Sequence, residues 1–349
     1  MDGGGVYGTI SRVKFGDIAQ LIRVLPWQGR GPGFESPYLH QGSFVKVCYN
    51  RTMKKITFSK IKLIKYLIIL GTLILFASLI SWCYFVYHSP KNVFDRMLAT
   101  NLSLPAIGKR VIQEDNSQAM SQDIALMTQP VARVKSTSVL SRAADTTIRT
   151  ESFGTPEADF VRYIDIKTGE KSVTGKAFDF SSVIGIWGKS TASDPESGGA
   201  QLFNQTLLGV IPMANLPKSA RESLLGQIKS SSVYKIDTRK VKKNFVNGRL
   251  VYIYDASIQP EHYVNMLKSF ARAMGLKQLE DVDPTQYADS APLQVVLEVD
   301  ALSSQLTKLT YRDSMRSEIY TAYGARIPFE VPTSSIPVND LQDRLQQIR

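Results

Sequence analysis

The sequence predicts an α+β protein that is mainly β, in which one transmembrane helix precedes an antiparallel sheet bent over a few helices. Three observations indicate this class. The stretch Tyr66–Tyr87 contains no charged residue. Many short segments rich in β-forming residues follow it, separated by Asn, Ser, Gly or Pro clusters, as in antiparallel hairpins. Asn247-Gly248 lies between two such segments and is the strongest short hairpin signal a sequence offers.

The uncharged stretch has 22 residues and, as a helix, covers roughly 33 Å, enough for a hydrocarbon core of about 30 Å. Five lysines precede the stretch closely, whereas only Lys91 follows it closely. Because positive charge marks the cytoplasmic side of a membrane span, we expect a single-pass signal anchor in the cell membrane with a cytoplasmic N-terminus. A cleaved signal peptide is the alternative, but the run is long and no A-x-A-like site follows it. The residues that set this topology are Lys54, Lys55, Lys60, Lys62 and Lys65, with Trp82, Tyr84 and Tyr87 at the outer interface.

The net charge of +11 is mostly a topology signal. Residues 1–52 carry six basic and three acidic residues, the five lysines follow, and the exported part is nearly balanced with 31 basic and 28 acidic residues. Nucleic acid is therefore not an expected partner, whereas the lysines favour anionic lipid headgroups. The two cysteines are Cys48 and Cys83, so the exported part contains no disulfide.

Residues 1–52 are expected to be a spurious extension. They show no sustained period, and Gly16–Gln41 resembles the conceptual translation of an alanine transfer-RNA gene. Gly33-Phe34-Glu35-Ser36 can encode the TΨC loop, and Pro26-Trp27-Gln28 an anticodon loop. On this interpretation the chain starts at Met53, and 53–65 is a basic cytoplasmic lead-in to the anchor at 66–87. The alternative is a disordered cytoplasmic tail.

The exported part begins with a helix and continues with strands. Apolar residues in Lys91–Leu102 recur on one helical face, which Pro105 closes. Ser190–Gly199 is expected to be a loop, Leu202–Ile211 carries mixed signals, and Pro217–Gln227 is expected to be helical. The first strands are predicted at Lys109–Glu114, Gln122–Thr128, Ala132–Ser141, Thr146–Ser152 and Phe160–Ile166.

The second half contains the clearest elements. Val233–Lys242 and Arg249–Ile258 are predicted to form one hairpin, and Pro260 opens a helix that ends at Gly275. A three-strand meander is expected at Leu293–Val299, Gln305–Asp313 and Ser317–Tyr323, followed by a short helix after Val338. No internal repeat or second domain is indicated.

Two segments near the C-terminus resemble the LolA/LppX-like family. LEVDALSSQLTKLTYRD (Leu297–Asp313) resembles its hairpin with an Asp and a Leu-x-x-Leu turn, and YGARIPFEVPTSSIPVNDL (Tyr323–Leu341) resembles its closing strand and tail. The order of elements over 90–345 fits as well. The resemblance implies an antiparallel half-barrel partly covered by helices, with an apolar cavity that carries or senses acyl chains. A protein anchor departs from the soluble or lipid-anchored members, which puts shuttling between membranes in doubt.

Catalytic and metal-binding patterns are missing from the exported sequence. Only His88 and His262 occur after residue 52, and one domain histidine without cysteine makes no zinc site. No G-x-S-x-G, G-x-x-x-x-G-K-[ST] or G-x-G-x-x-G occurs there. The acidic cluster around Asp281 lacks the ligand spacing of a calcium loop. We therefore expect no enzyme activity, metal or cofactor, with an envelope hydrolase as a remote alternative.

The candidate binding residues are cavity-lining side chains. Tyr263, Leu267, Phe270 and Met274 share one face of the Pro-initiated helix, and Trp187 is a second candidate wall. The same helical face is also what an ordinary core helix presents. The expected function is binding of a membrane lipid or lipoprotein through its acyl chain. The alternative is an envelope adaptor or sensor with a filled interior, and the oligomeric state is left open.

Overall fold

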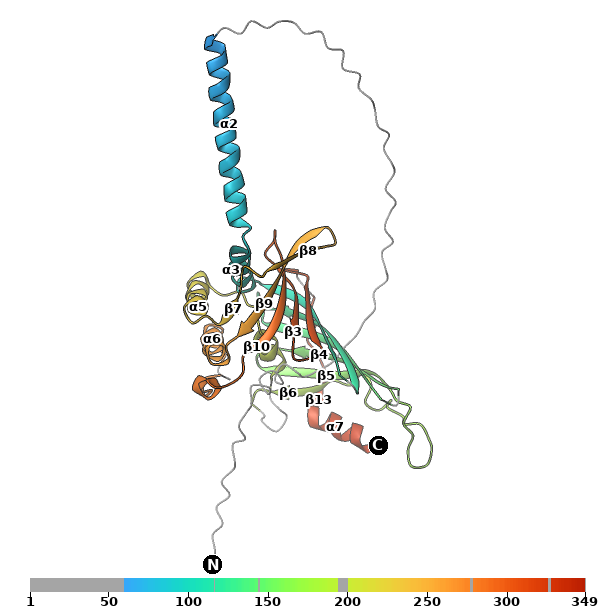
Figure 1. Cartoon of the computed structure of the whole chain (residues 1–349). Helices are drawn as coiled ribbons and strands as arrows, with labels where there is room; N and C mark the ends of the chain where they lie inside the picture. The colour runs from blue at the N-terminus through green and yellow to red at the C-terminus, as the bar shows by residue number, and fades with distance from the viewer. Residues whose placement is uncertain are drawn as a thin grey trace, which may run out of the picture. The chain divides into compact units, whose positions relative to one another are not determined.

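The computed structural model describes residues 60–115, 117–143, 145–193, 200–276, 279–325 and 328–348 (Figure 1). The predicted extension 1–52, with its resemblance to a transfer-RNA gene, and the lysines Lys54 and Lys55 lie outside these ranges. The described chain belongs to two compact units, one that ends at Ser89 and one that begins at Pro90.

The first unit contains helix α2 (Lys60–Tyr87). Its stretch Lys65–Tyr87 has a mean hydropathy of 2.2 and none of it is buried in the protein. A helix of this length and composition can cross a hydrocarbon core of about 30 Å. The predicted apolar helix is therefore present.

Strands of the second unit form one sheet of thirteen strands within the described residues. Neighbours follow the order β13-β6-β5-β4-β3-β2-β1-β12-β11-β10-β9-β7, and β8 pairs with β9 beside this path. All pairings are antiparallel except that of β13 with β6. The strands are β1 (Ala106–Glu114), β2 (Gln118–Met127), β3 (Arg133–Arg142), β4 (Thr146–Gly154), β5 (Ala158–Lys167), β6 (Gly188–Thr191), β7 (Tyr234–Ile236), β8 (Lys242–Val246), β9 (Arg249–Ile258), β10 (Leu293–Asp300), β11 (Leu306–Tyr311), β12 (Arg316–Thr321) and β13 (Ile336–Pro337).

A long-range pairing joins the two halves of the sheet. β1 pairs with β12, with Lys109 opposite Tyr320 and Val111 opposite Glu318. The meander β10–β12 therefore continues directly into the hairpins β1–β5. This confirms the predicted class, an α+β protein with one large, mainly antiparallel sheet.

The helices of the second unit are α3 (Pro90–Asn101), α4 (Leu202–Leu207), α5 (Lys218–Ser230), α6 (Pro260–Ala273), the 3-10 helix η1 (Pro284–Tyr287) and α7 (Val338–Gln347). Figure 1 shows α3, α5 and α6 gathered beside the sheet. Val93 and Met97 of α3 join Phe270 of α6 and Leu297 and Leu309 of the sheet in one core cluster, and all five are fully buried. Residues 90–348 thus contain a hydrophobic core of their own.

Most predicted elements are confirmed, and three differ. Of the predicted strand Val233–Lys242, only Tyr234–Ile236 is the strand β7, and a turn in which the Lys240 N–H donates to the Asp237 carbonyl follows it. The strand that precedes Asn247-Gly248 is β8, which begins at Lys242. Gly188–Thr191, predicted in part as a loop, pairs with the open edge of β5. Leu202–Ile211 contains only the short helix α4.

Candidate functional site

A buried charge cluster lies on the inner face of the sheet, where β1, β11 and β12 meet. Ile107 and Val111 of β1 belong to the main core, and alternation places Lys109 on the same face. The register sets Tyr320 beside Lys109 and Glu318 beside Val111. The alternation of β1 and its register with β12 therefore place Lys109 and Glu318 in the core.

The carboxylate of Glu318 accepts four hydrogen bonds. Its Oε2 accepts from Lys109 Nζ at 2.9 Å and from the Tyr320 hydroxyl at 2.9 Å. Its Oε1 accepts from an Arg316 nitrogen at 2.8 Å and from the Tyr311 hydroxyl at 3.2 Å. A carboxylate offers about four acceptor positions, so this one is saturated. Glu318 is 1% exposed, and the cluster is shielded from solvent.

The electrostatics of the cluster favour the charged form of Glu318. Burial raises the pKa of Glu318, but Lys109 and Arg316 more than offset this, so its pKa lies well below the usual 4.5. Burial and the charge of Glu318 raise the pKa values of Tyr311 and Tyr320 far above 10, so both remain neutral donors. The cluster therefore holds its charges by ion pairs and hydrogen bonds within the protein.

Three of the four predicted residues on α6 lie in the main core, and Tyr263 is near the charge cluster. Tyr263, Leu267 and Phe270 are at most 3% exposed and pack in the main core. The Tyr263 hydroxyl donates to the Gly209 carbonyl at 2.9 Å. Burial and the nearby charge of Glu318 raise the pKa of Tyr263. Met274, just after the last helical turn, is half-buried against the same core.

Trp187 lies in a different place, on the outer face of the sheet. The Arg162 guanidinium stacks on its ring, 4.6 Å from the centroid, and Arg162 pairs with Glu151. Lys135 Nζ lies 2.6 Å from a Glu151 oxygen. These side chains line a pocket of about 580 Å³ that the segment 328–334 borders. The structure therefore does not bring Trp187 together with the residues on α6.

Several of the predicted topology residues lie on α2. Trp82, Tyr84 and Tyr87, predicted for the outer interface, have more than half of their surface open, and Lys65 is exposed at the start of the apolar stretch. Lys60 and Lys62 belong to the helix. A band of aromatic side chains at one end of an apolar helix is typical of a membrane interface.

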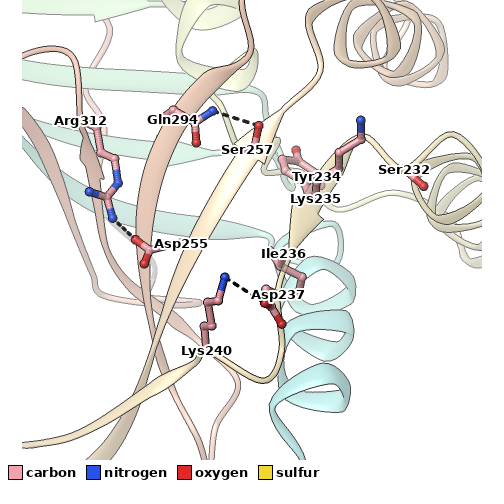
Figure 2. Close-up of a pocket in the computed structure, with 10 residues that line it drawn as sticks. All are labelled: Ser232, Tyr234, Lys235, Ile236, Asp237, Lys240, Asp255, Ser257, Gln294 and Arg312. Carbon is pink, nitrogen blue, oxygen red and sulfur yellow. Dashed lines mark hydrogen bonds and ion pairs between the residues drawn. The ribbon is translucent and has the colours of Figure 1, made fainter.

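The pocket in Figure 2 has a volume of about 860 Å³ and lies between β7, β9 and β10. Arg312 pairs with Asp255, Gln294 Nε2 donates to the Ser257 hydroxyl at 3.0 Å, and Lys240 lies 3.5 Å from Asp237. These polar pairs do not offer the apolar wall that an acyl chain needs. The lining residues are Ser232, Tyr234, Lys235, Ile236, Asp237, Lys240, Asp255, Ser257, Gln294 and Arg312.

Sequence reasoning did not find the charge cluster. A usable signal was present, since Lys109 occupies an apolar-face position between Ile107 and Val111. A lysine there is ordinarily taken to lie on the solvent face, and its partners are more than 200 residues away. Among the described residues, no group of three or more His, Cys, Asp or Glu is placed to hold a metal ion.

Comparisons with known proteins return structural matches only. No family model matches the chain, and no curated protein does. The chain is similar to the crystal structure of LprF from Mycobacterium bovis, with 11% identity and a TM-score of 0.37, over 69% of this chain and 96% of that one. It is also similar to the Mycobacterium tuberculosis lipoprotein LppX, with 10% identity and a TM-score of 0.34, over 68% of this chain and 96% of that one.

Proposed function

We propose that this chain is a non-catalytic protein of the cell envelope, held in the cell membrane by α2, whose β domain binds the acyl chain of a lipid or lipoprotein outside the cytoplasm. The observation that carries the proposal is the interior between the sheet and α6. Apolar side chains from α6 and from the strands form one extended core there, and an acyl chain matches such surroundings.

Binding requires α6 to move away from the sheet. Tyr263, Leu267 and Phe270 now fill the space beside β10 and β11, so an acyl chain has to replace their contacts. A buried chain gains about 0.8 kcal/mol per methylene, and a long tail therefore compensates for contacts that the helix loses. Met274 at the end of α6 is half-buried, and the flexible side chain of methionine adapts to irregular apolar guests.

A second candidate function is that of an envelope adaptor or sensor that binds other proteins and keeps its interior filled. The packing of α6 favours it, because the predicted lining residues lie in the core and not at the pocket of Figure 2. The two candidates differ in one measurable property, which is whether a lipid occupies the domain.

Native mass spectrometry distinguishes the two candidate functions. The sample is residues 90–349, purified from cells without detergent. Additional mass that fragments as a lipid supports the first candidate. Consistent absence of lipid, also after incubation with lipid extract, overturns it and leaves the adaptor. A reporter fused after Arg349 tests the topology, and activity only in the cytosol would overturn an exported domain.

A further inference from the structure

The β8–β9 hairpin extends away from the rest of the sheet. β8 pairs only with the first half of β9, from Val246 opposite Arg249 to Lys242 opposite Ile253. Every residue of β8 is exposed. We name Thr238–Arg249 the basic hairpin.

The tip of the basic hairpin exposes large apolar side chains. Phe245 is 73% exposed and Val246 39%. Leu302, in the neighbouring β10–β11 turn, is 64% exposed, and the Ala301 N–H in this turn donates to the Leu250 carbonyl at 2.9 Å. Exposed apolar side chains that gather in one place mark a surface that contacts another apolar phase.

Positive charge lies along the basic hairpin that carries this apolar tip. The basic hairpin contains no acidic residue and five basic ones, which are Arg239, Lys240, Lys242, Lys243 and Arg249. Two carboxylates lie nearby, Asp237 at 3.5 Å from Lys240 and Asp300 at 3.8 Å from Arg249. They are too few to balance five cations, so the hairpin is complementary to an anionic surface.

The domain's first helix lies against the same strand and the same turn. The Tyr254 hydroxyl of β9 donates to the Pro90 carbonyl at 2.7 Å, and Arg96 Nε donates to the Ser304 hydroxyl at 3.0 Å. Only His88 and Ser89 separate α3 from α2 in the sequence. If α2 is the membrane anchor, a bilayer is available at the end of the domain that carries the basic hairpin.

We propose that the basic hairpin is a second membrane contact, which docks on anionic phospholipid headgroups of the bilayer that holds α2. Phe245 and Leu302 enter the interface, and the lysines bind the headgroups. This inference rests on the proposed anchor and goes beyond it, because a second contact sets the orientation of the domain on the membrane.

Flotation of residues 90–349 with lipid vesicles tests the proposal, since this part has its own core and lacks α2. Wild type should bind vesicles of phosphatidylglycerol and phosphatidylcholine but not phosphatidylcholine alone, and raised salt should release it. Each lysine near an anionic surface contributes about 1 kcal/mol, so Lys242→Gln with Lys243→Gln should lower partitioning about thirtyfold. Phe245→Ser should lower it about tenfold, by loss of apolar contact.

A matched control is the exposed loop after β5, in which Lys171 and Lys176 flank the fully exposed Val173. The strand pairings place the end of β5 and the start of β9 at opposite ends of the sheet. The triple variant Lys171→Gln, Val173→Ser, Lys176→Gln should bind vesicles like wild type.

The proposal is overturned if wild type does not float with anionic vesicles, as expected of a hairpin that binds only proteins. It is also overturned if the control loses as much binding as the hairpin variants, since the attraction is then unspecific. Circular dichroism confirms that each variant is folded. The anchor is tested separately by carbonate extraction of the full chain from membranes, so failure of the anchor and failure of the hairpin give different results.

Discussion

Replacement of Glu318 by Gln tests whether the charge cluster organises the interior of the domain. The change keeps the size of the side chain and removes the anion from between Lys109 and Arg316, which are 8% and 6% exposed. Breaking a buried ion pair by removal of one partner costs about 3–5 kcal/mol, because an unpaired charge stays buried. We expect a loss of this size in the free energy of unfolding, or about 10 °C in Tm for a domain of this length.

Urea unfolding of residues 90–349, followed by circular dichroism, measures the effect. The matched control is Asp123→Asn, which breaks the ion pair with Arg110 on the outer face of β1 and β2. Both side chains of that pair are more than one-third exposed, so the change should cost at most about 1 kcal/mol. If Glu318→Gln costs no more than Asp123→Asn, water reaches the cluster and the reasoning is refuted.

Acid should remove the contribution of Glu318. Its pKa is lowered by folding, so the stabilisation is complete above the unfolded value of about 4.5 and declines by up to about 1.4 kcal/mol per pH unit below it. The difference in stability between wild type and Glu318→Gln should therefore narrow as the pH falls from 5 to 3, and a constant difference in urea titrations would contradict this. Two glycines should respond in opposite directions to substitution by alanine. At Gly154 a Cβ would lie 2.8 Å from a Val134 methyl group, and we expect a loss of about 1–3 kcal/mol from overpacking. At Gly226 in α5 a Cβ meets nothing within 4 Å, and the helix should gain about 0.5–1 kcal/mol. Thermal unfolding of the two variants checks both signs, and a stabilised Gly154→Ala would show that the packing there is loose.

Local pattern was sufficient for most elements of this chain. The uncharged stretch before Ser89 predicts α2, since its length and composition alone decide whether it can span a bilayer. Pro260 and the apolar spacing after it predict α6 nearly to its ends. The turn signal at Asn247-Gly248 marks the tight connection between β8 and β9. In each case the residues that decide the structure are neighbours in the sequence.

Long-range pairing determined the remainder. The segment predicted as one strand before Asn247-Gly248 contains β7 and the start of β8, and these two strands pair with different portions of β9. The sequence indicates both Trp187 and the apolar face of α6 as candidate cavity walls, but the two lie on opposite faces of the sheet. The residues next to Trp187 in the sequence form no pattern that predicts which face of the sheet its side chain occupies.

The charge cluster shows the same division most clearly. Alternation in β1 groups Lys109 with Ile107 and Val111, and this much can be read from the residues alone. The pairing of β1 with β12, more than 200 residues away, decides whether that face lies in the core. The same pairing decides whether a carboxylate lies next to Lys109. Hydrophobic periodicity reports which residues share a face, whereas the partner of that face is selected only when the whole chain has packed.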